Sequence, residues 1–159
     1  MLFNTSYTDN EITKQINNLV GKPFSFIKAI KLKGIGSKRM IIDEVSPNLH
    51  TIVNLVNDIN YGSIELRPKG ILIHIGKGLQ RFAWVIPYYK LVIYKTNGAS
   101  IHADGKFIHF RKNKNRIREI IVNVYSKNED AVLLGLKTNL TQKELNTIIS
   151  KSSYRMARN

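Results

Sequence analysis

The stretch Ser100–Arg111, SIHADGKFIHFR, predicts a β-hairpin whose strand register follows from its own residues. Asp104-Gly105 at its centre is typical of a two-residue type I′ turn, in which both central residues take a positive φ. Strands that flank such a turn pair residue by residue outward from it. The expected pairs are Ala103 with Lys106, His102 with Phe107, Ile101 with Ile108, and Ser100 with His109.

The two faces of this predicted hairpin differ in polarity, because successive side chains of a strand point to opposite faces. One face carries Ala103, Ile101, Ile108 and Phe110, and the other carries His102, Phe107 and His109. We therefore expect the first face to lie in a core and the second to face water.

Further strand candidates precede the hairpin, each bounded by turn residues. They cover residues 50–56, 64–67, 71–75, 79–86 and 91–95, with Trp84 expected in the core. Consecutive short strands with tight connections predict an antiparallel meander that is curved into a barrel or packed as a sandwich.

Helical patterns flank this meander. Residues 8–20 predict a helix capped by Thr8 or Asp9, and residues 24–33 predict a strand or a second short helix. The clearest helix follows the hairpin and is capped by Asn113 or Asn115. Its apolar stripe consists of Ile117, Ile120, Ile121, Val124 and Tyr125. A capping box at Thr141–Glu144 predicts a short last helix.

The patterns together predict an α+β chain of one compact domain with appendages. Residues 1–45 are expected to form a helical or irregular extension. Residues 46–127 are expected to form the curved antiparallel sheet and a capping helix, and residues 128–159 a helical extension with a basic tail. A strongly curved sheet with an open end would accept the apolar stripe of the helix.

Charge is the outlying property of the composition. The chain has 25 Lys and Arg residues against 11 Asp and Glu, a formal net charge of +14. The positive electrostatic field of such a chain attracts nucleic acid or an anionic lipid surface. The chain is also rich in Asn, Ile and Lys, a bias that suggests an AT-rich coding background. Whether the charge is functional or compositional therefore stays open at this point.

Other compositional features bound the class of protein. Cysteine is absent, so neither a disulfide framework nor a thiolate zinc site is expected. No apolar run approaches the roughly 20 residues of a membrane-spanning helix. The first residues, MLFNTSYTDNEITKQ, lack the basic-then-apolar order of a signal peptide, so we expect a cytoplasmic protein.

Three segments carry a resemblance to a known family. SIELRPKGILIHI, WVIPYYKLVIY and SIHADGKFIHFR, followed by an amphipathic helix, resemble the bacterial pleckstrin-homology-like (PH-like) domains over residues 50–127. The resemblance implies a barrel with the helix plugging one end, ligand-binding loops at the other end, and a binding or scaffolding role without chemistry. Relatives that bind phosphoinositides place Lys and Arg across the first two strands, whereas the first candidate strand here, HTIVNLV, has neither.

The basic run RKNKNRIR is the candidate anion or partner site. It contributes Arg111, Lys112, Lys114, Arg116 and Arg118. Because a strand feeds a helix here, the cations and the helix amides can converge on one anion. The alternative is a solvated loop followed by the outer face of the helix. Tyr88-Tyr89-Lys90 likewise offers either an aromatic and cationic loop or part of the core.

No constellation in the sequence predicts catalysis or a cofactor. GIGSKR at residues 34–39 and GKGLQR at residues 76–81 lack the complete glycine spacing and the Lys-Ser/Thr ending of a phosphate-binding loop. His74, His102 and His109 lie in adjacent predicted strands, but no carboxylate or thiolate completes a metal set at matching spacing. We therefore expect no enzyme activity, no metal and no cofactor.

The sequence favours a non-catalytic PH-like binding or scaffolding module with a basic surface. Its partner would be another protein or an anionic membrane surface. One alternative is a small nucleic-acid-binding protein, which the charge favours. The other is a structural subunit whose terminal helices drive oligomerisation.

Overall fold

A computed structural model describes residues 1–32, 34–53, 59–111, 137–138, 141, 143–144 and 146–147. Its helices include α1 (Asn10–Val20) and α2 (Phe26–Lys31), with single 3₁₀ turns at Pro47–Leu49 and Tyr88–Lys90. Residues 143–144 and 146–147, where the sequence predicts a last helix, are helical as well. Its strands are β1 (Leu2–Asn4), β2 (Met40–Val45), β3 (Tyr61–Arg67), β4 (Gly70–Lys77), β5 (Gln80–Pro87), β6 (Val92–Thr96), β7 (Gly98–Ala103), β8 (Lys106–Arg111) and β9 (Lys137–Thr138).

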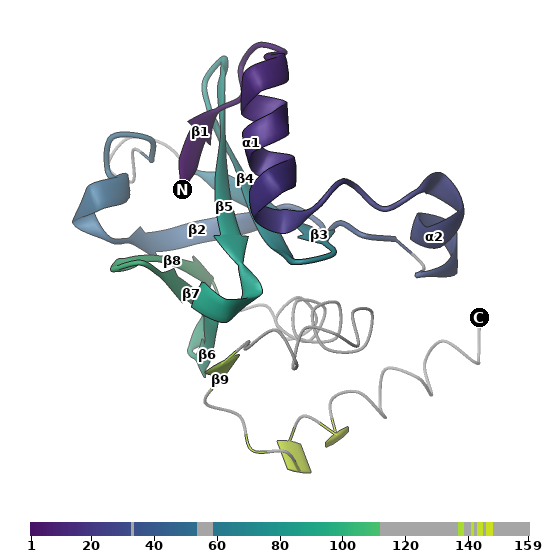
Figure 1. Cartoon of the computed structure of the whole chain (residues 1–159). Helices are drawn as coiled ribbons and strands as arrows, with labels where there is room; N and C mark the ends of the chain where they lie inside the picture. Colours follow the sequence, from purple (N-terminus) through teal and green to yellow (C-terminus); the bar gives the residue numbers. More distant parts are fainter. Residues whose placement is uncertain are drawn as a thin grey trace.

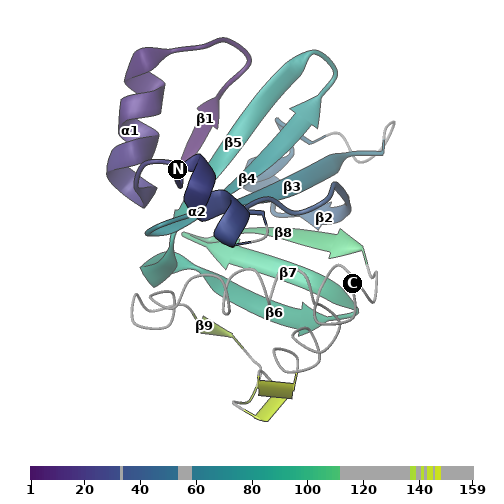
Figure 2. The same cartoon turned by 90° about the vertical axis from the view of Figure 1, so that its right-hand side faces the viewer.

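The strands form one antiparallel sheet with the order β1-β5-β4-β3-β2-β8-β7-β6, to which the two residues of β9 add in parallel beside β6. The sheet bends at β2, whose first residues pair with β3 and whose last residues pair with β8. A register shift between Ile42 and Glu44 accompanies this change of partner. Figures 1 and 2 show the β3–β5 half and the β6–β8 half in different planes. In the described part of the chain the sheet stays open, with β1 and β9 at its edges.

The register of the β7–β8 hairpin is the predicted one. Ile101 pairs with Ile108 and Ser100 with His109, while Asp104 and Gly105 take φ values of 49° and 69°. Ile101 and Ile108 are fully buried, whereas His102 and His109 lie on the opposite, partly exposed face. The turn sets the register of the hairpin, and the alternation of apolar and polar residues then sets which side chains enter the core.

The main core lies between the two halves of the bent sheet. Its largest fully buried side chains include Trp84 of β5, Tyr88 of the following turn and Phe110 of β8. Burial of each such side chain stabilises the fold by about 1.5–3 kcal/mol before conformational entropy is subtracted.

Helix α1 covers the opposite face of β4 and β5 and forms a second, smaller core there. Ile16 and Val20 of α1 pack with Leu72, Ala83 and Val85 of the sheet. The helix lies within the segment predicted as helical, and the Asp9 side chain accepts hydrogen bonds from the amides of Glu11 and Ile12. These strands are thus apolar on both faces wherever α1 covers them.

The strand predicted over residues 50–56 is wrong for residues 50–53, which are the part of it that the structure describes. Residues 47–49 form a 3₁₀ turn and residues 50–52 a further turn, while residues 54–58 lie outside the described part of the chain. The Ser46 amide donates to the Phe107 carbonyl at 3.0 Å, and its hydroxyl accepts from the Phe107 amide at 3.1 Å. Pro47 follows at once and has no amide hydrogen, so the ladder with β8 ends there. The first long strand is instead β2, from the segment assigned to the N-terminal extension.

Two other expectations concern the flanking segments. Residues 24–33, expected as a strand or a short helix, contain helix α2. The capping box is present, because the Glu144 carboxylate accepts from the Thr141 amide at 3.0 Å and the Thr141 hydroxyl accepts from the Glu144 amide at 3.3 Å. The helix predicted after the hairpin and the basic tail lie outside the described residues.

Candidate functional site

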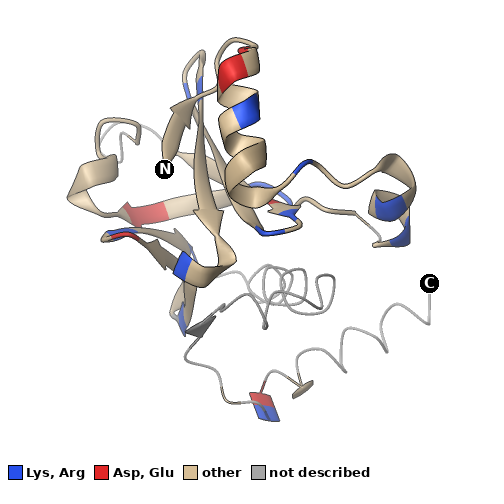
Figure 3. Cartoon of the chain, viewed as in Figure 1, with Lys and Arg blue, Asp and Glu red and all other residues tan. Residues whose placement is uncertain are grey.

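Positive charge is concentrated on the connection between α1 and β2. Figure 3 shows Lys and Arg on α2 and along the chain on either side of it. No Asp or Glu occurs between Glu11 and Asp43 in the sequence. Elsewhere in the described structure, ion pairs offset several cations: Lys14 with Glu11, Lys90 with Asp104, Arg67 with Glu65, and Arg111 with Asp43.

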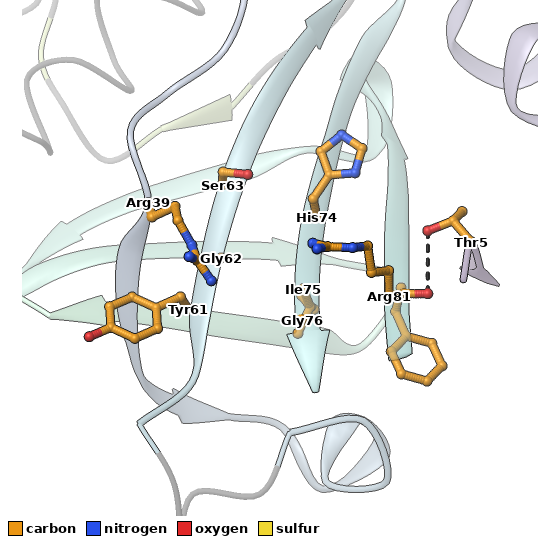
Figure 4. A pocket seen from close by; sticks show the side chains of 10 residues that line it. Thr5, Arg39, Tyr61, Gly62, Ser63, His74, Ile75, Gly76 and Arg81 are labelled. Carbon is orange, nitrogen blue, oxygen red and sulfur yellow. Dashed lines mark hydrogen bonds between the residues drawn. The ribbon is translucent and has the colours of Figure 1, made fainter. Parts of the chain in front are cut away.

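A polar hollow of about 260 Å³ lies on the outer face of β3, β4 and β5, beside the end of β1. Its lining residues are Thr5, Arg39, Tyr61, Gly62, Ser63, His74, Ile75, Gly76, Arg81 and Phe82. Figure 4 shows the side chains of Arg39 and Arg81 reaching toward each other from opposite sides of β3 and β4. We call this feature the Arg39–Arg81 hollow.

The strand alternation explains why these side chains meet. Ile64 on β3 and Ile73 on β4 point into the core, so Ser63 and His74, which are paired across the two strands, point outward. Arg81 faces the same side from β5, where Gly76 is its cross-strand partner. A Cβ at Gly76 would meet no atom within 4 Å, so the floor of the hollow stays open there.

Arg39 reaches the hollow from the segment that precedes β2. The Ser37 amide donates to the Ile64 carbonyl at 2.7 Å, and the Ser37 hydroxyl accepts from the Ile64 amide at 2.9 Å. These bonds hold the segment beside β3. The guanidinium carbon of Arg39 lies 5.1 Å from the ring centroid of Tyr61, a cation–π geometry that orients the side chain.

A carboxylate lies near the hollow, and neighbouring groups already engage it. The two Glu65 carboxylate oxygens lie 2.6 Å from Nε of Arg67 and 2.8 Å from Nε2 of His74. Burial alone would raise the pKa of the Glu65 carboxyl, but the hydrogen bond with His74 and the charge of Arg67 outweigh it, so the pKa is lowered. The two arginine side chains that line the hollow are cationic, and guanidinium groups suit an anion.

The predicted basic site is only partly described. Nη2 of Arg111 lies 2.6 Å from Oδ1 of Asp43, so this member of the cluster joins the end of β8 to β2. Lys112, Lys114, Arg116 and Arg118 lie outside the described residues. How these five cations lie relative to one another thus stays a prediction.

The aromatic loop divides between the core and the surface. Tyr88 is fully buried and its hydroxyl donates to the Arg67 carbonyl at 3.1 Å, while Tyr89 is exposed. Nζ of Lys90 lies 5.9 Å from the Tyr89 ring centroid and 3.0 Å from the Asp104 carboxylate. The partial-core interpretation therefore holds for Tyr88.

His102 and His109 border a second hollow, of about 440 Å³, on the outer face of β6–β8. His102 lies 2.7 Å from the Ser100 hydroxyl, is stacked on Phe107 and meets the edge of Tyr94. Burial, and then the nearby charge of His109, lower the pKa of His102. Within the described ranges, no three His, Cys, Asp or Glu side chains gather to hold a metal ion.

Sequence reasoning missed Arg39 and Arg81 as partners, although a signal for both was present. Arg39 ends the segment GIGSKR and Arg81 ends GKGLQR, the two glycine-containing runs that fail the phosphate-loop pattern. The two residues are far apart in the sequence, and only the pairing of β2 with β3, of β3 with β4, and of β4 with β5 brings them to one hollow.

No protein-family model, curated protein or solved structure matches the chain. Of the helices in the described residues, none has the length and apolar character needed to cross a bilayer. Evidence on function therefore has to come from the residues of the chain itself.

Proposed function

We propose that the protein is a non-catalytic, PH-like binding module of the cytoplasm that docks on an anionic partner through its basic surface. The order of the elements supports this proposal. Seven consecutive antiparallel strands, β2 to β8, precede the segment whose sequence predicts an amphipathic helix. This is the element order that the PH-like resemblance implies.

The observation that carries the proposal is the Arg39–Arg81 hollow. Two guanidinium groups from separate parts of the chain line one polar hollow, while the nearby Glu65 is engaged by Arg67 and His74. Guanidinium groups donate several hydrogen bonds in a fixed planar arrangement that matches phosphate and carboxylate oxygens. An anionic group on a larger partner is the ligand that this arrangement suits.

The test is a binding panel at low and near-physiological salt. The probes are vesicles with anionic lipid, short DNA, short RNA and an acidic peptide, offered to the wild type and to the variant Arg39→Gln/Arg81→Gln. We expect the wild type to bind at least one probe and the variant to bind it at least about tenfold more weakly. The variant Lys14→Gln/Lys106→Gln removes the same net charge outside the hollow and should stay within about twofold of the wild type.

The outcomes separate the competing functions. Preferential binding of DNA or RNA would favour the nucleic-acid alternative, and a large stable assembly without any polyanion binding would favour the structural subunit. A wild type that binds no probe even at low salt, or a folded double variant that binds undiminished, would refute the proposed role of the hollow.

A further inference from the structure

The connection between α1 and β2 leaves the sheet and returns to it at two firmly held points. Where it leaves, the Lys69 amide donates to the Val20 carbonyl at 2.9 Å. Where it returns, the Leu66 amide donates to the Ile35 carbonyl at 2.7 Å. Phe24 and Ile35 pack against the main core on either side of α2. The ends of the connection are therefore anchored, and α2 stands between two anchors.

Helix α2 itself buries none of its residues. Its large apolar side chains Phe26, Ile27 and Ile30 are 80%, 68% and 61% exposed. Figure 1 shows α2 standing away from the sheet. Single exposed apolar residues are ordinary on protein surfaces. Three neighbouring ones at the tip of an anchored projection form a contiguous apolar patch, which is typical of an interaction site.

The charged residues on the connection that carries this patch are all basic. At about 100° per residue, Phe26, Ile27 and Ile30 fall within one arc of α2, and Lys28 and Lys31 fall on the adjoining arc. Lys22 and Lys38 lie before and after the helix in a stretch without a single Asp or Glu. An apolar face bordered by lysines is the pattern of helices that lie in the interface of an anionic bilayer.

We propose that α2 is a membrane-docking helix that places Phe26, Ile27 and Ile30 among the headgroups and upper acyl chains of an anionic bilayer. Lys22, Lys28 and Lys31 contact lipid phosphates at the same time. This inference rests on the proposed anion-binding function and specifies its partner. A lipid surface is favoured over a protein groove because the cations border the apolar patch without any carboxylate, which complements a uniformly negative surface.

The first experiment reports the environment of the patch directly. The chain contains no cysteine, so Ile27→Cys can be labelled at one site with an environment-sensitive fluorophore. Leu79→Cys, at the fully exposed tip of the β4–β5 hairpin, is the matched control. With vesicles containing phosphatidylglycerol, we expect a blue shift and brightening of the label at position 27 and no change at position 79. Neutral phosphatidylcholine vesicles should produce neither.

The second experiment measures partitioning into the same vesicles. The variant Phe26→Ser/Ile27→Ser/Ile30→Ser should partition at least about 100-fold more weakly, because the apolar area that would enter the bilayer is removed. The variant Lys28→Gln/Lys31→Gln should partition about 25-fold more weakly, at about fivefold per cation. Leu79→Ser should partition like the wild type. Thermal unfolding should stay unchanged in all three, since none of these side chains is buried.

Three outcomes would overturn the inference in distinguishable ways. If vesicle binding requires Arg39 and Arg81 but the label at position 27 stays in water, α2 does not dock and the proposed function stands. If no polyanion binds at all, both proposals fail. If the triple serine variant turns a dimer into a monomer while vesicle binding is unchanged, the patch is covered by a second copy of the chain.

Discussion

Glu65 on β3 and His74 on β4 are diagonal neighbours on the outer face of the sheet, with Oε2 of the carboxylate 2.8 Å from Nε2 of the imidazole. The other carboxylate oxygen lies 2.6 Å from Nε of Arg67, whose side chain is almost buried. The cluster stands beside the Arg39–Arg81 hollow and neutralises the carboxylate that would otherwise repel an anion.

This cluster predicts a specific loss of stability in acid. The pKa of Glu65 in the folded protein is below its ordinary value of 4.5. The stability that it contributes is therefore fully present above pH 4.5 and is lost as the pH falls through the folded pKa. Glu65→Gln should destabilise the protein by about 1–3 kcal/mol at pH 7 and flatten the acid limb of its stability curve.

Urea unfolding between pH 3 and pH 7 measures this effect. Glu11→Gln is the control, because Glu11 forms an exposed ion pair with Lys14 on α1. An acid limb of unchanged steepness in Glu65→Gln would show that the cluster does not couple folding to pH.

The β7–β8 hairpin predicts a sharp contrast between two neighbouring residues. Ile108 is fully buried, so Ile108→Ala should lower the free energy of unfolding by about 2–5 kcal/mol through the cavity that it leaves. His109→Ala, on the outer face, should lower it by well under 1 kcal/mol. Chemical denaturation of both variants checks the contrast, and equal losses would contradict the observed division of the faces.

Gly70 and Gly76 of β4 allow a matched pair of alanine substitutions, one at a closely packed position and one at an open position. A Cβ at Gly70 would collide with the Ile86 carbonyl and lie 2.6 Å from Cγ1 of Val20. Gly70→Ala should therefore destabilise the protein by about 2–4 kcal/mol. Gly76→Ala, on the same strand with no atom within 4 Å of the added carbon, should be nearly neutral. Comparable unfolding midpoints for the two variants would contradict the close approach of the β5 backbone and of Val20 of α1 to Gly70.

Among the cations of the basic run after β8, we expect four to affect binding and Arg111 to affect stability. Reversal of Lys112, Lys114, Arg116 and Arg118 to Glu, with Arg111 retained, should weaken polyanion binding and preserve folding. Arg111→Glu should instead lower the thermal unfolding midpoint, because it places a carboxylate opposite Asp43 on β2. A fourfold variant that folds and binds like the wild type would limit the anion surface to the Arg39–Arg81 hollow and the α2 connection.

The hairpin could be predicted because the residues that specify its turn and its register are close together in the sequence. Asp104-Gly105 restricts φ at two positions, and the alternation of Ile101, His102 and Ala103 then assigns the faces. The strand predicted from residue 50 onward does not form over residues 50–53, for the opposite reason. Its β-branched residues favour a strand, but Ser46 and Pro47 end the pairing with β8 before that segment begins.

The candidate site could not be predicted, because its two arginines meet only through strand pairing. Nothing in GIGSKR or GKGLQR specifies that β2 lies beside β3 or that β4 and β5 complete the same face. One feature of the sequence did indicate that a further element covers the outer face of the sheet. Leu72, Ala83 and Val85 are apolar on the side that strict alternation assigns to water, and α1 packs there.

Residues close together along the chain specify the hairpin register, a cap for α1 at either Thr8 or Asp9, and a basic stretch around α2 without Asp or Glu. In the folded chain Asp9 is the cap, Arg39 and Arg81 share a hollow, α1 covers the outer face of β4 and β5, and α2 keeps its three large apolar side chains exposed. These features depend on long-range pairing and on competition for buried surface, which local residue patterns do not encode.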